Sequence, residues 1–341
     1  MKRKSTLLKQ RLVDTNGVRL RVFEAGPLDG PAVVLAHGFP SLGYSWRRIL
    51  PVLAAAGYHV LAPDQRGYGG SSCPDDVDSY DITALTTDLV GLLDNIGAKR
   101  AVWIGHDLGG MVAWAAAHLH PDRVAGVVGL NFPPSPRGKL PTTQALRKMV
   151  GDSFLYMLYF QQPGPADAEL DHDPAQALRR IMSFDLQSLT DPDAATRMIA
   201  PGPMGFVDRL PEPGHPPAWL DDGEFTYYVD EFTRTGFTGA LNWYRNFDRN
   251  WEILANPASA TVAAPALVII GTNDPTQGFT PRNRATQVAT GPYHEVTLDG
   301  AGHWLQEERA ADVSTELLHF LAAVPGYQTN HGPSKVTDPL P

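Results

Sequence analysis

Short, strongly apolar segments recur along the chain at spacings that leave room for a helix between them. Four of them are "PAVVLAHG" (31–38), "HVLAPDQRG" (59–67), "RAVWIGHD" (100–107) and "VAGVVGLN" (124–131). Each is rich in β-branched residues and is followed by glycine, proline or polar turn residues. Segments that are apolar on both faces are typical of strands buried in a parallel sheet, whose neighbours need a crossover connection.

One such crossover is predicted in "DITALTTDLVGLLDNIG" (81–97). Its leucines and Ile96 recur at helical spacing, Asp81 can cap the start of the helix, and Gly97 can end it. Strands that alternate with helices in this way favour an α/β fold with a doubly wound, mostly parallel sheet.

The pattern changes after "NFPPSPRGKLP", where apolar and acidic stretches with Pro–Gly breaks continue to about Trp251. The strand pattern then returns in "APALVIIGTNDP" and "YHEVTLDGAGHW", followed by the amphipathic segment "ERAADVSTELLHFLAAV". This order predicts a mostly helical insertion within one sheet. We expect a core formed by residues 1–133 and 256–323, a cap or lid over 134–255, and a loose tail at 324–341.

Composition limits the partners. The 341 residues are 43% hydrophobic and 19% charged, which is enough apolar material for a sizeable core. Lys and Arg total 28 against 37 Asp and Glu, and the net charge of -9 argues against a nucleic-acid partner or an anionic membrane. The basic N-terminus lacks the apolar region of a signal peptide, no stretch reaches membrane-spanning length, and Cys73 is the single cysteine. These features predict a cytoplasmic protein without membrane insertion.

The segment "IGHDLGGMVAW" (104–114) ends one predicted strand and places Asp107 among glycines. It resembles the Gly-x-Ser-x-Gly elbow of α/β-hydrolases, in which a strand turns sharply into a helix and exposes a nucleophile. A carboxylate in that place can attack carbon directly and form an ester, whereas a serine needs a base to remove its proton first. Asp107 is therefore the candidate nucleophile.

Two further residues follow later strands in the order that a catalytic triad requires. Asp274 comes after "ALVII", and His303 comes after "HEVTL". Side chains at the carboxyl ends of parallel strands gather at one edge of the sheet, so these residues can meet Asp107. Asp274 would orient His303, and His303 would act as a general base on water. Either residue alone would suit a turn or a structural role, but their joint placement favours catalysis.

The segment "LAHGFPSLGYSW" follows the first strong strand, where α/β-hydrolases keep the loop that donates one oxyanion-hole N–H. The backbone N–H groups of Phe39 and Leu108 are the natural donor pair. His37 is interpreted as structural. His118 and His120 lie two apart on a predicted helix and point to different sides, which makes them poor joint metal ligands. No metal or organic cofactor is expected.

Six segments together resemble the soluble epoxide hydrolases of the α/β-hydrolase fold, over nearly the whole chain except its ends. They are "HGFPSLGYSWRRILPVLAAAGYHVLAPDQRGYGGSS", "GHDLGGM", "YMLYFQQPGPADAEL", "GFTGALNWYRNFDRNW", "GTNDP" and "GAGHW". The resemblance implies that Tyr156 and Tyr244 on the lid hold and protonate the epoxide oxygen, and that the Phe39–Pro40 bond is cis. The sequence departs from the commonest pattern at Leu108, where many members carry Trp.

The resemblance also implies hydrolysis of a small apolar epoxide by water to a vicinal diol, without a cofactor. Opening the ring leaves an alkoxide, and a neutral phenol can donate a proton to it. Two alternatives stay open: a haloalkane dehalogenase-like hydrolase and a non-catalytic small-ligand receptor on the same scaffold. Leu108 cannot bind halide as a Trp can, and a receptor has no need of all five polar residues. The physiological epoxide and the oligomeric state, a homodimer included, remain open.

Overall fold

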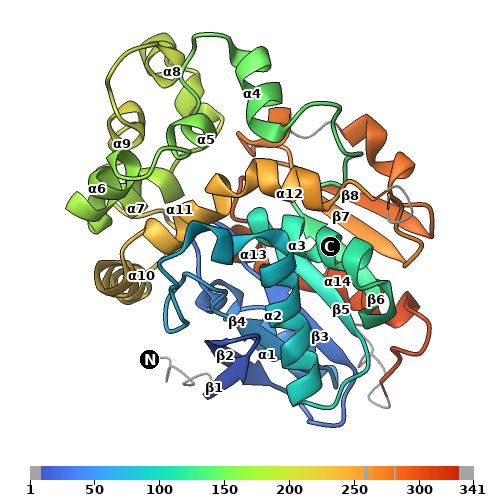
Figure 1. Ribbon diagram of the computed structural model, residues 1–341. Coiled ribbons are helices and arrows are strands. Elements are labelled where there is room, and N and C mark those ends of the chain that lie inside the picture. The colour runs from blue at the N-terminus through green and yellow to red at the C-terminus, as the bar shows by residue number, and fades with distance from the viewer. Residues whose placement is uncertain (1–8, 257–259, 280–281, 330–341) are drawn as a thin grey trace.

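The computed structural model describes residues 9–256, 260–279 and 282–329. Its centre is an eight-stranded sheet in the order β1-β2-β4-β3-β5-β6-β7-β8 (Figure 1). From β3 to β8 the neighbouring strands are parallel, whereas β2 runs antiparallel to β1 and β4. The strands are β1 Lys9–Thr15, β2 Val18–Ala25, β3 Ala32–Ala36, β4 His59–Pro63, β5 Ala101–His106, β6 Val124–Leu130, β7 Ala266–Gly271 and β8 Tyr293–Leu298.

Helices cover both faces of this sheet. The helices that flank it are α1 Leu50–Ala55, α2 Ile82–Asn95, α3 Leu108–Leu119, α13 Leu305–Glu308 and α14 Ala310–Ala323. Apolar residues of α2 and α3 pack in one buried cluster with one face of the sheet, and those of α1 and α14 pack in a second cluster with the other face. The predicted doubly wound α/β fold is confirmed, and Asp81 caps α2 by accepting the N–H of Ala84 at 2.9 Å.

The insertion between β6 and β7 is helical, as predicted. Its helices are α4 Thr142–Val150, α5 Tyr156–Tyr159, α6 Pro165–His172, α7 Pro174–Met182, α8 Pro192–Ile199, α9 Phe206–Arg209, α10 Asp222–Thr235, α11 Thr238–Arg245 and α12 Phe247–Ile253. In Figure 1 these green to orange elements lie above the core, at the end of the sheet where β5 leads into α3. The lid therefore covers the edge at which the candidate catalytic residues follow their strands.

Strand register explains why those residues meet. Ala36 pairs with Gly105, His106 with Leu130, and Leu130 with Ile269. The carboxyl ends of β3, β5, β6 and β7 consequently lie level with one another, and the loops that follow them share one edge of the sheet.

The sequence analysis missed the first two strands, which form a hairpin at the edge of the sheet. Asn16 and Gly17 make its two-residue turn, with φ of 45° and 75°. Positive φ at both positions is the signature of a type I′ turn, for which Asn-Gly is the strongest sequence signal. The dipeptide in "VDTNGVRL" was therefore the signal that could have found the hairpin.

The expectation of a loose tail from residue 324 is wrong for its first part. Tyr327 is 5% exposed and its hydroxyl donates to the Arg100 carbonyl at 2.8 Å, while the Thr329 hydroxyl donates to the Ala56 carbonyl at 2.7 Å. These side chains anchor residues 324–329 to the core. The remainder of the tail, 330–341, lies outside the described residues.

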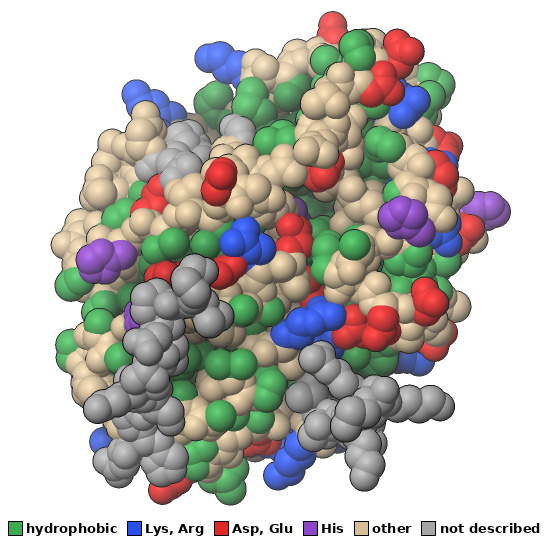
Figure 2. Space-filling view, turned by 180° about the vertical axis from the view of Figure 1, so that it is seen from behind, with side chains coloured by type: hydrophobic (Ala, Val, Ile, Leu, Met, Phe, Trp, Pro, Cys, Tyr) green, Lys and Arg blue, Asp and Glu red, His purple; other side chains and the backbone are tan. Residues whose placement is uncertain are grey.

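Buried ion pairs connect the lid to the core. Glu307 of α13 accepts hydrogen bonds from Arg47, Arg48 and, at 3.1 Å, the Tyr228 hydroxyl of α10. Arg47 also donates to Glu224 of α10 at 2.7 Å. On the opposite face from the view of Figure 1, acidic and basic side chains are interspersed among apolar ones (Figure 2). Within the described ranges, no helix is both long and apolar enough to cross a membrane.

Candidate active site

Asp107 occupies the sharp turn between β5 and α3, with φ of 52° and ψ of -127°. Two glycines make this turn possible. A Cβ on Gly105 would lie 2.1 Å from the Gly109 carbonyl oxygen, and one on Gly109 would lie 2.2 Å from the Ala36 carbonyl oxygen. The turn therefore packs backbone against backbone, and it holds Asp107 in a conformation that non-glycine residues rarely adopt.

Backbone N–H groups on two loops converge on the Asp107 carboxylate. The Phe39 N–H donates to Oδ1 at 2.9 Å, and the Leu108 N–H also donates to the carboxylate. The Phe39–Pro40 peptide bond is cis, as the family resemblance implied. Burial raises the pKa of Asp107 above its usual value, although His303 and the two N–H groups act in the opposite direction. The second oxygen, Oδ2, faces His303.

His303 lies between two carboxylates. Its Nδ1 is 3.0 Å from Asp274 Oδ1, and its Nε2 is 3.9 Å from Asp107 Oδ2. Burial disfavours the charged imidazole, but Asp274 and then Asp107 outweigh burial and raise the pKa of His303 to about 9. At neutral pH the ring is therefore an imidazolium, held between Asp274 and Asp107.

Asp274 is held in turn by Thr276, a residue that the sequence analysis did not single out. The Thr276 backbone N–H donates to Asp274 Oδ1 at 2.9 Å, and its hydroxyl contacts both carboxylate oxygens. Burial opposes ionisation of Asp274, but the charge of His303 and these hydrogen bonds outweigh it and lower the pKa of Asp274. Asp274 is thus ionised and fixed in orientation.

The two lid tyrosines named by the resemblance lie together above Asp107. Tyr156 begins α5, Tyr244 lies on α11, and their ring centroids are 6.0 Å apart. Burial, with the charge of Asp107 as a smaller contribution, raises the pKa of both phenols. Both hydroxyls are therefore protonated at neutral pH and can donate a hydrogen bond to a ligand.

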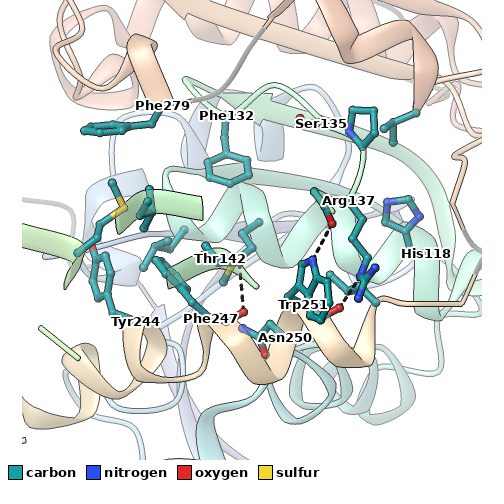
Figure 3. A pocket seen from close by; sticks show the side chains of 18 of the residues that line it. His118, Phe132, Ser135, Arg137, Thr142, Tyr244, Phe247, Asn250, Trp251 and Phe279 are labelled. Atoms are coloured by element: carbon teal, nitrogen blue, oxygen red, sulfur yellow. Dashed lines mark hydrogen bonds between the residues drawn. The ribbon is translucent and has the colours of Figure 1, made fainter. Parts of the chain in front are cut away.

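Two cavities meet at these residues. One has a volume of 660 Å³ and extends past Thr142 and Asn250 to Arg137, whose guanidinium stacks on Trp251 at 3.5 Å (Figure 3). The other has a volume of 410 Å³, and lid side chains such as Phe154, Ile181, Phe184, Met198 and Phe206 line it. Asp107, Tyr156, Tyr244, Thr276 and Phe279 belong to both linings. The Asp107 carboxylate and the two phenols thus line both cavities.

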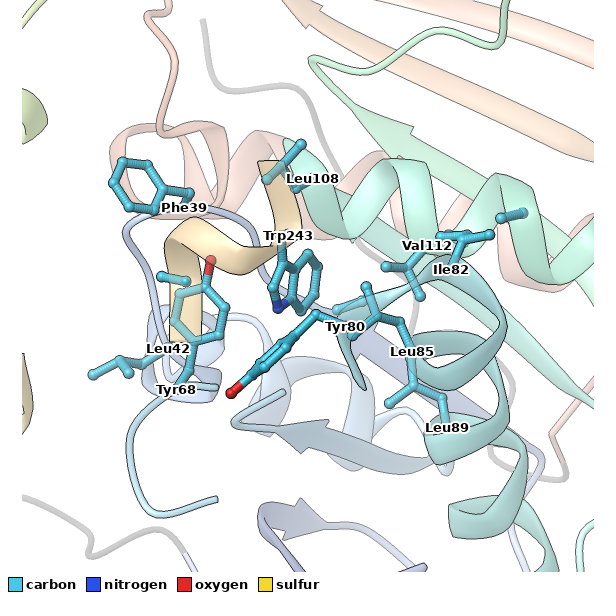
Figure 4. Close-up of a cluster of buried hydrophobic side chains, with 14 of the residues drawn as sticks. Phe39, Leu42, Tyr68, Tyr80, Ile82, Leu85, Leu89, Leu108, Val112 and Trp243 are labelled. Atoms are coloured by element: carbon cyan, nitrogen blue, oxygen red, sulfur yellow. The ribbon is translucent and has the colours of Figure 1, made fainter. Parts of the chain in front are cut away.

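Leu108 contributes both backbone and side chain to this region. Its N–H points to the Asp107 carboxylate, while its side chain is 5% exposed and belongs to the same buried cluster as Phe39, Tyr68 and Trp243 (Figure 4). An aliphatic side chain offers no N–H donor to a halide at the place where a Trp would supply one.

His37 is structural, as expected. It is fully buried, its Nε2 accepts the Gln65 N–H at 3.0 Å, and its Nδ1 is 3.0 Å from the Gly38 carbonyl oxygen. Burial lowers the pKa of His37 to about 4, so the ring is neutral, and it links the loop that carries Phe39 to the segment that follows β4. Elsewhere among the described residues, no group of three or more His, Cys, Asp or Glu side chains is arranged to hold a metal ion.

Comparison with known proteins agrees with this geometry. The family model described as alpha/beta hydrolase fold matches residues 31–310. Epoxide hydrolase A of Mycobacterium tuberculosis is 60% identical over 315 residues, which cover 92% of this chain and 98% of the relative. Epoxide hydrolase 3 of Siraitia grosvenorii is 34% identical, covering 91% of this chain and 96% of the relative.

Solved structures give the same result. The crystal structure of Epoxide Hydrolase A from Mycobacterium thermoresistibile superposes with a TM-score of 0.89 at 59% identity, covering 93% of this chain and 99% of that one. An epoxide hydrolase from an endophytic Streptomyces superposes with a TM-score of 0.87 at 38% identity, covering 93% of this chain and 96% of that one. The chain belongs to the epoxide hydrolase family of the α/β-hydrolase fold.

Proposed function

We propose that this member of the epoxide hydrolase family converts a small apolar epoxide and water to a vicinal diol, through a covalent hydroxyalkyl ester on Asp107. The observation that carries the proposal is the surroundings of one carboxylate. Oδ1 of Asp107 accepts the Phe39 N–H, Oδ2 faces His303, and two phenols line the same space. A nucleophile, proton donors and a base are therefore present around one reacting carbon.

In the first step Oδ2 of Asp107 attacks an epoxide carbon. The C–O bond of the ring breaks, its electron pair moves to the ring oxygen, and that oxygen takes a proton from Tyr156 or Tyr244. The products are the ester and a tyrosinate. A proton transferred from the imidazolium of His303, directly or through solvent, restores the phenol and leaves His303 neutral.

In the second step neutral His303 removes a proton from water, and the hydroxide oxygen attacks Cγ of Asp107. The resulting oxyanion forms at Oδ1, where the N–H groups of Phe39 and Leu108 already converge. The oxyanion then collapses and the Cγ–Oδ2 bond breaks, the leaving alkoxide, which carries Oδ2, takes the proton from His303, and the diol departs. The new Asp107 carboxylic acid returns a proton to His303, which restores the starting charges.

Loss of charge on Asp107 explains how one histidine serves both states. Asp107 is one of the two carboxylates that raise the pKa of His303 to about 9. Ester formation removes that negative charge, so the pKa of His303 falls as the ester forms. The site therefore changes its base from the charged to the neutral form when the second step requires it.

The insertion over 134–255 acts in this proposal as the lid that supplies Tyr156 and Tyr244 and covers the reacting carbon. We also assign the protein to the cytoplasm, on the basis of its acidic charge and single cysteine. Cell fractionation would test that assignment, and a homodimer would be recognised by light scattering of the purified protein.

A single turnover in isotopically labelled water tests the ester mechanism. With enzyme in excess over a styrene-type epoxide, label from water enters the Asp107 carboxylate and the diol stays unlabelled, because the diol takes its oxygen from the enzyme. Asp107→Ala should form no diol. Label found directly in the diol after one turnover would overturn the covalent mechanism, and halide release from haloalkanes at a rate comparable to diol formation would favour the dehalogenase alternative.

A further inference from the structure

Asn131 follows β6 and joins two loops that carry triad residues. Its side chain is buried, and its backbone has a positive φ of 53°. Nδ2 donates to the carbonyl oxygens of Gly302 at 3.1 Å and His303 at 2.9 Å, while Oδ1 accepts the Gly271 N–H at 2.9 Å. The amide thus donates to backbone carbonyl groups in the loop after β8 and accepts from a backbone N–H at the end of β7.

The His303 carbonyl oxygen is the meeting point of three donors. Besides Asn131, it accepts from His106 Nε2 at 2.8 Å and from the Leu305 N–H at 3.0 Å. The Leu305 bond lies within the same turn and cannot fix that turn relative to the sheet. The bonds from Asn131 and His106 come from β6 and β5, the strands beside Asp107.

His106 is suited to this task because it is neutral and has one fixed tautomer. Burial lowers its pKa to about 3, and its Nδ1 lies 3.2 Å from Gln306 Nε2, which can only donate. The ring proton is therefore on Nε2 and points to the His303 carbonyl oxygen.

We propose that Asn131 is a positioning residue for the second chemical step: it holds the His303 backbone so that the imidazole can direct water at the Asp107 ester. The inference rests on the proposed two-step reaction. Ester formation depends on Asp107, Tyr156 and Tyr244, whereas the hydrogen bonds of the Asn131 amide go to Gly271, Gly302 and His303. Ester hydrolysis depends on His303, whose carbonyl oxygen accepts one of these hydrogen bonds. Loss of the amide should therefore slow hydrolysis and leave ester formation nearly unchanged.

The test compares the two rate constants in Asn131→Gly and in the unaltered enzyme. Glycine removes the amide and tolerates the positive φ without strain. Rapid acid quench and intact-protein mass measure the ester, and diol release measures its hydrolysis. We expect hydrolysis to fall by about 10- to 100-fold, since small misplacements of a catalytic group have effects of that order. Ester formation should stay close to its original rate, so the ester accumulates on the variant.

Asn246→Ala is the matched control. Asn246 is also buried, and its Nδ2 donates to two carbonyl oxygens, those of Val77 at 2.6 Å and Asn242 at 2.8 Å. Its removal should leave the ratio of the two rate constants unchanged. If Asn131→Gly does not fold, Asn131→Asp serves instead, because it keeps the shape and the acceptor for Gly271 but loses both donors.

A further variant distinguishes failure of the Asn131 role from failure of the two-step ester mechanism. His303→Gln should trap the ester if the two-step reaction holds, and failure to trap any ester there would overturn the proposed function. If His303→Gln traps the ester but the Asn131 variants change both rate constants equally, or neither, Asn131 has no step-specific role and the inference is wrong.

Discussion

At the scale of single residues, the proposed reaction depends first on the carboxylate of Asp107. In the proposed mechanism it attacks without a base, and the Phe39 and Leu108 N–H groups assigned to its oxyanion already donate to the carboxylate. In that proposal His303 acts as a base only in the second step, on water, and its role in the first step is to return a proton to the phenol. The two residues have separate tasks, and substitutions at each should affect different steps.

The first prediction concerns the phenols. Tyr156→Phe combined with Tyr244→Phe should lower the rate of ester formation by about 100-fold or more, because no acid remains to protonate the ring oxygen. Stopped-flow or quench measurement of the first step would detect this loss. Tyr159→Phe, on the same short helix but absent from the residues that line either cavity, should react nearly as fast as the unaltered enzyme. Equal rates in the double variant would exclude the phenols as acids.

The second prediction concerns pH. Ester hydrolysis needs neutral His303, so its rate should rise with pH through the pKa of that residue in the ester. This midpoint should lie below the value of about 9 in the free enzyme, because the charge of Asp107 is lost. Asp274→Asn should lower the midpoint further by removing the second negative charge. The decay of pre-formed ester across a pH series measures the midpoint in the unaltered enzyme and in the variant. An unchanged midpoint in Asp274→Asn would contradict the proposal that His303, paired with Asp274, is the base.

At the scale of secondary-structure elements, periodicity and caps made the parallel strands and α2 predictable from local sequence. Asp81 caps α2 and also accepts Arg249 Nε of α12 at 2.9 Å. The N-terminal hairpin was missed because its strands alternate polar and apolar residues at an edge of the sheet, a pattern weaker than that of buried strands. Its Asn-Gly turn was the stronger signal.

A third prediction follows from the cap. Asp81→Ala should lower the free energy of unfolding by about 1 kcal/mol, because the Ala84 N–H loses its acceptor. Asp81→Asn keeps an acceptor oxygen, so its free energy of unfolding should fall by clearly less. Urea unfolding followed by tryptophan fluorescence distinguishes the two, and an equal loss in both variants would assign the effect to the Arg249 pair rather than to the cap.

At the scale of the whole molecule, buried ion pairs and hydrogen bonds connect the lid to the core. Glu307 accepts hydrogen bonds from Arg47 and Arg48 of the core and from Tyr228 of the lid. Burial raises the pKa of Glu307 despite its arginine partners. Its side chain is 1% exposed. A carboxylate buried this deeply stabilises the fold only through its ion-pair partners. Its removal would leave the positive charges of the two arginines only partly neutralised.

The fourth prediction concerns the contribution of the Glu307 ion pairs to stability. Glu307→Gln should lower the free energy of unfolding by about 3 kcal/mol, the order expected when one partner of a buried ion pair is removed. Asp14→Asn is the surface control, since Asp14 pairs with Arg19 in solvent and its loss should produce no measurable change. Urea unfolding of both variants at neutral pH measures the difference. Similar small effects in the two would show that the buried network does not stabilise the joined lid and core.

The sequence by itself determined the parallel sheet, the helical insertion and the kinds of residue offered for chemistry. Buried strands, caps and the tight glycine elbow leave local patterns, and the order of Asp107, Asp274 and His303 along the chain matches the order of their strands. The lid tyrosines had no such local signal, and only the family resemblance pointed to Tyr156 and Tyr244.

The tertiary structure decided the rest, because the deciding contacts join residues far apart in sequence. The separation of 3.0 Å between His303 and Asp274, the raised pKa of His303 and the residues shared by the linings of two cavities depend on how loops from different strands pack together. Asn131 ends a predicted strand segment, but nothing in the local sequence identified its partner. Its amide bonds to His303, 172 residues away, and only the level ends of neighbouring parallel strands bring these two residues together.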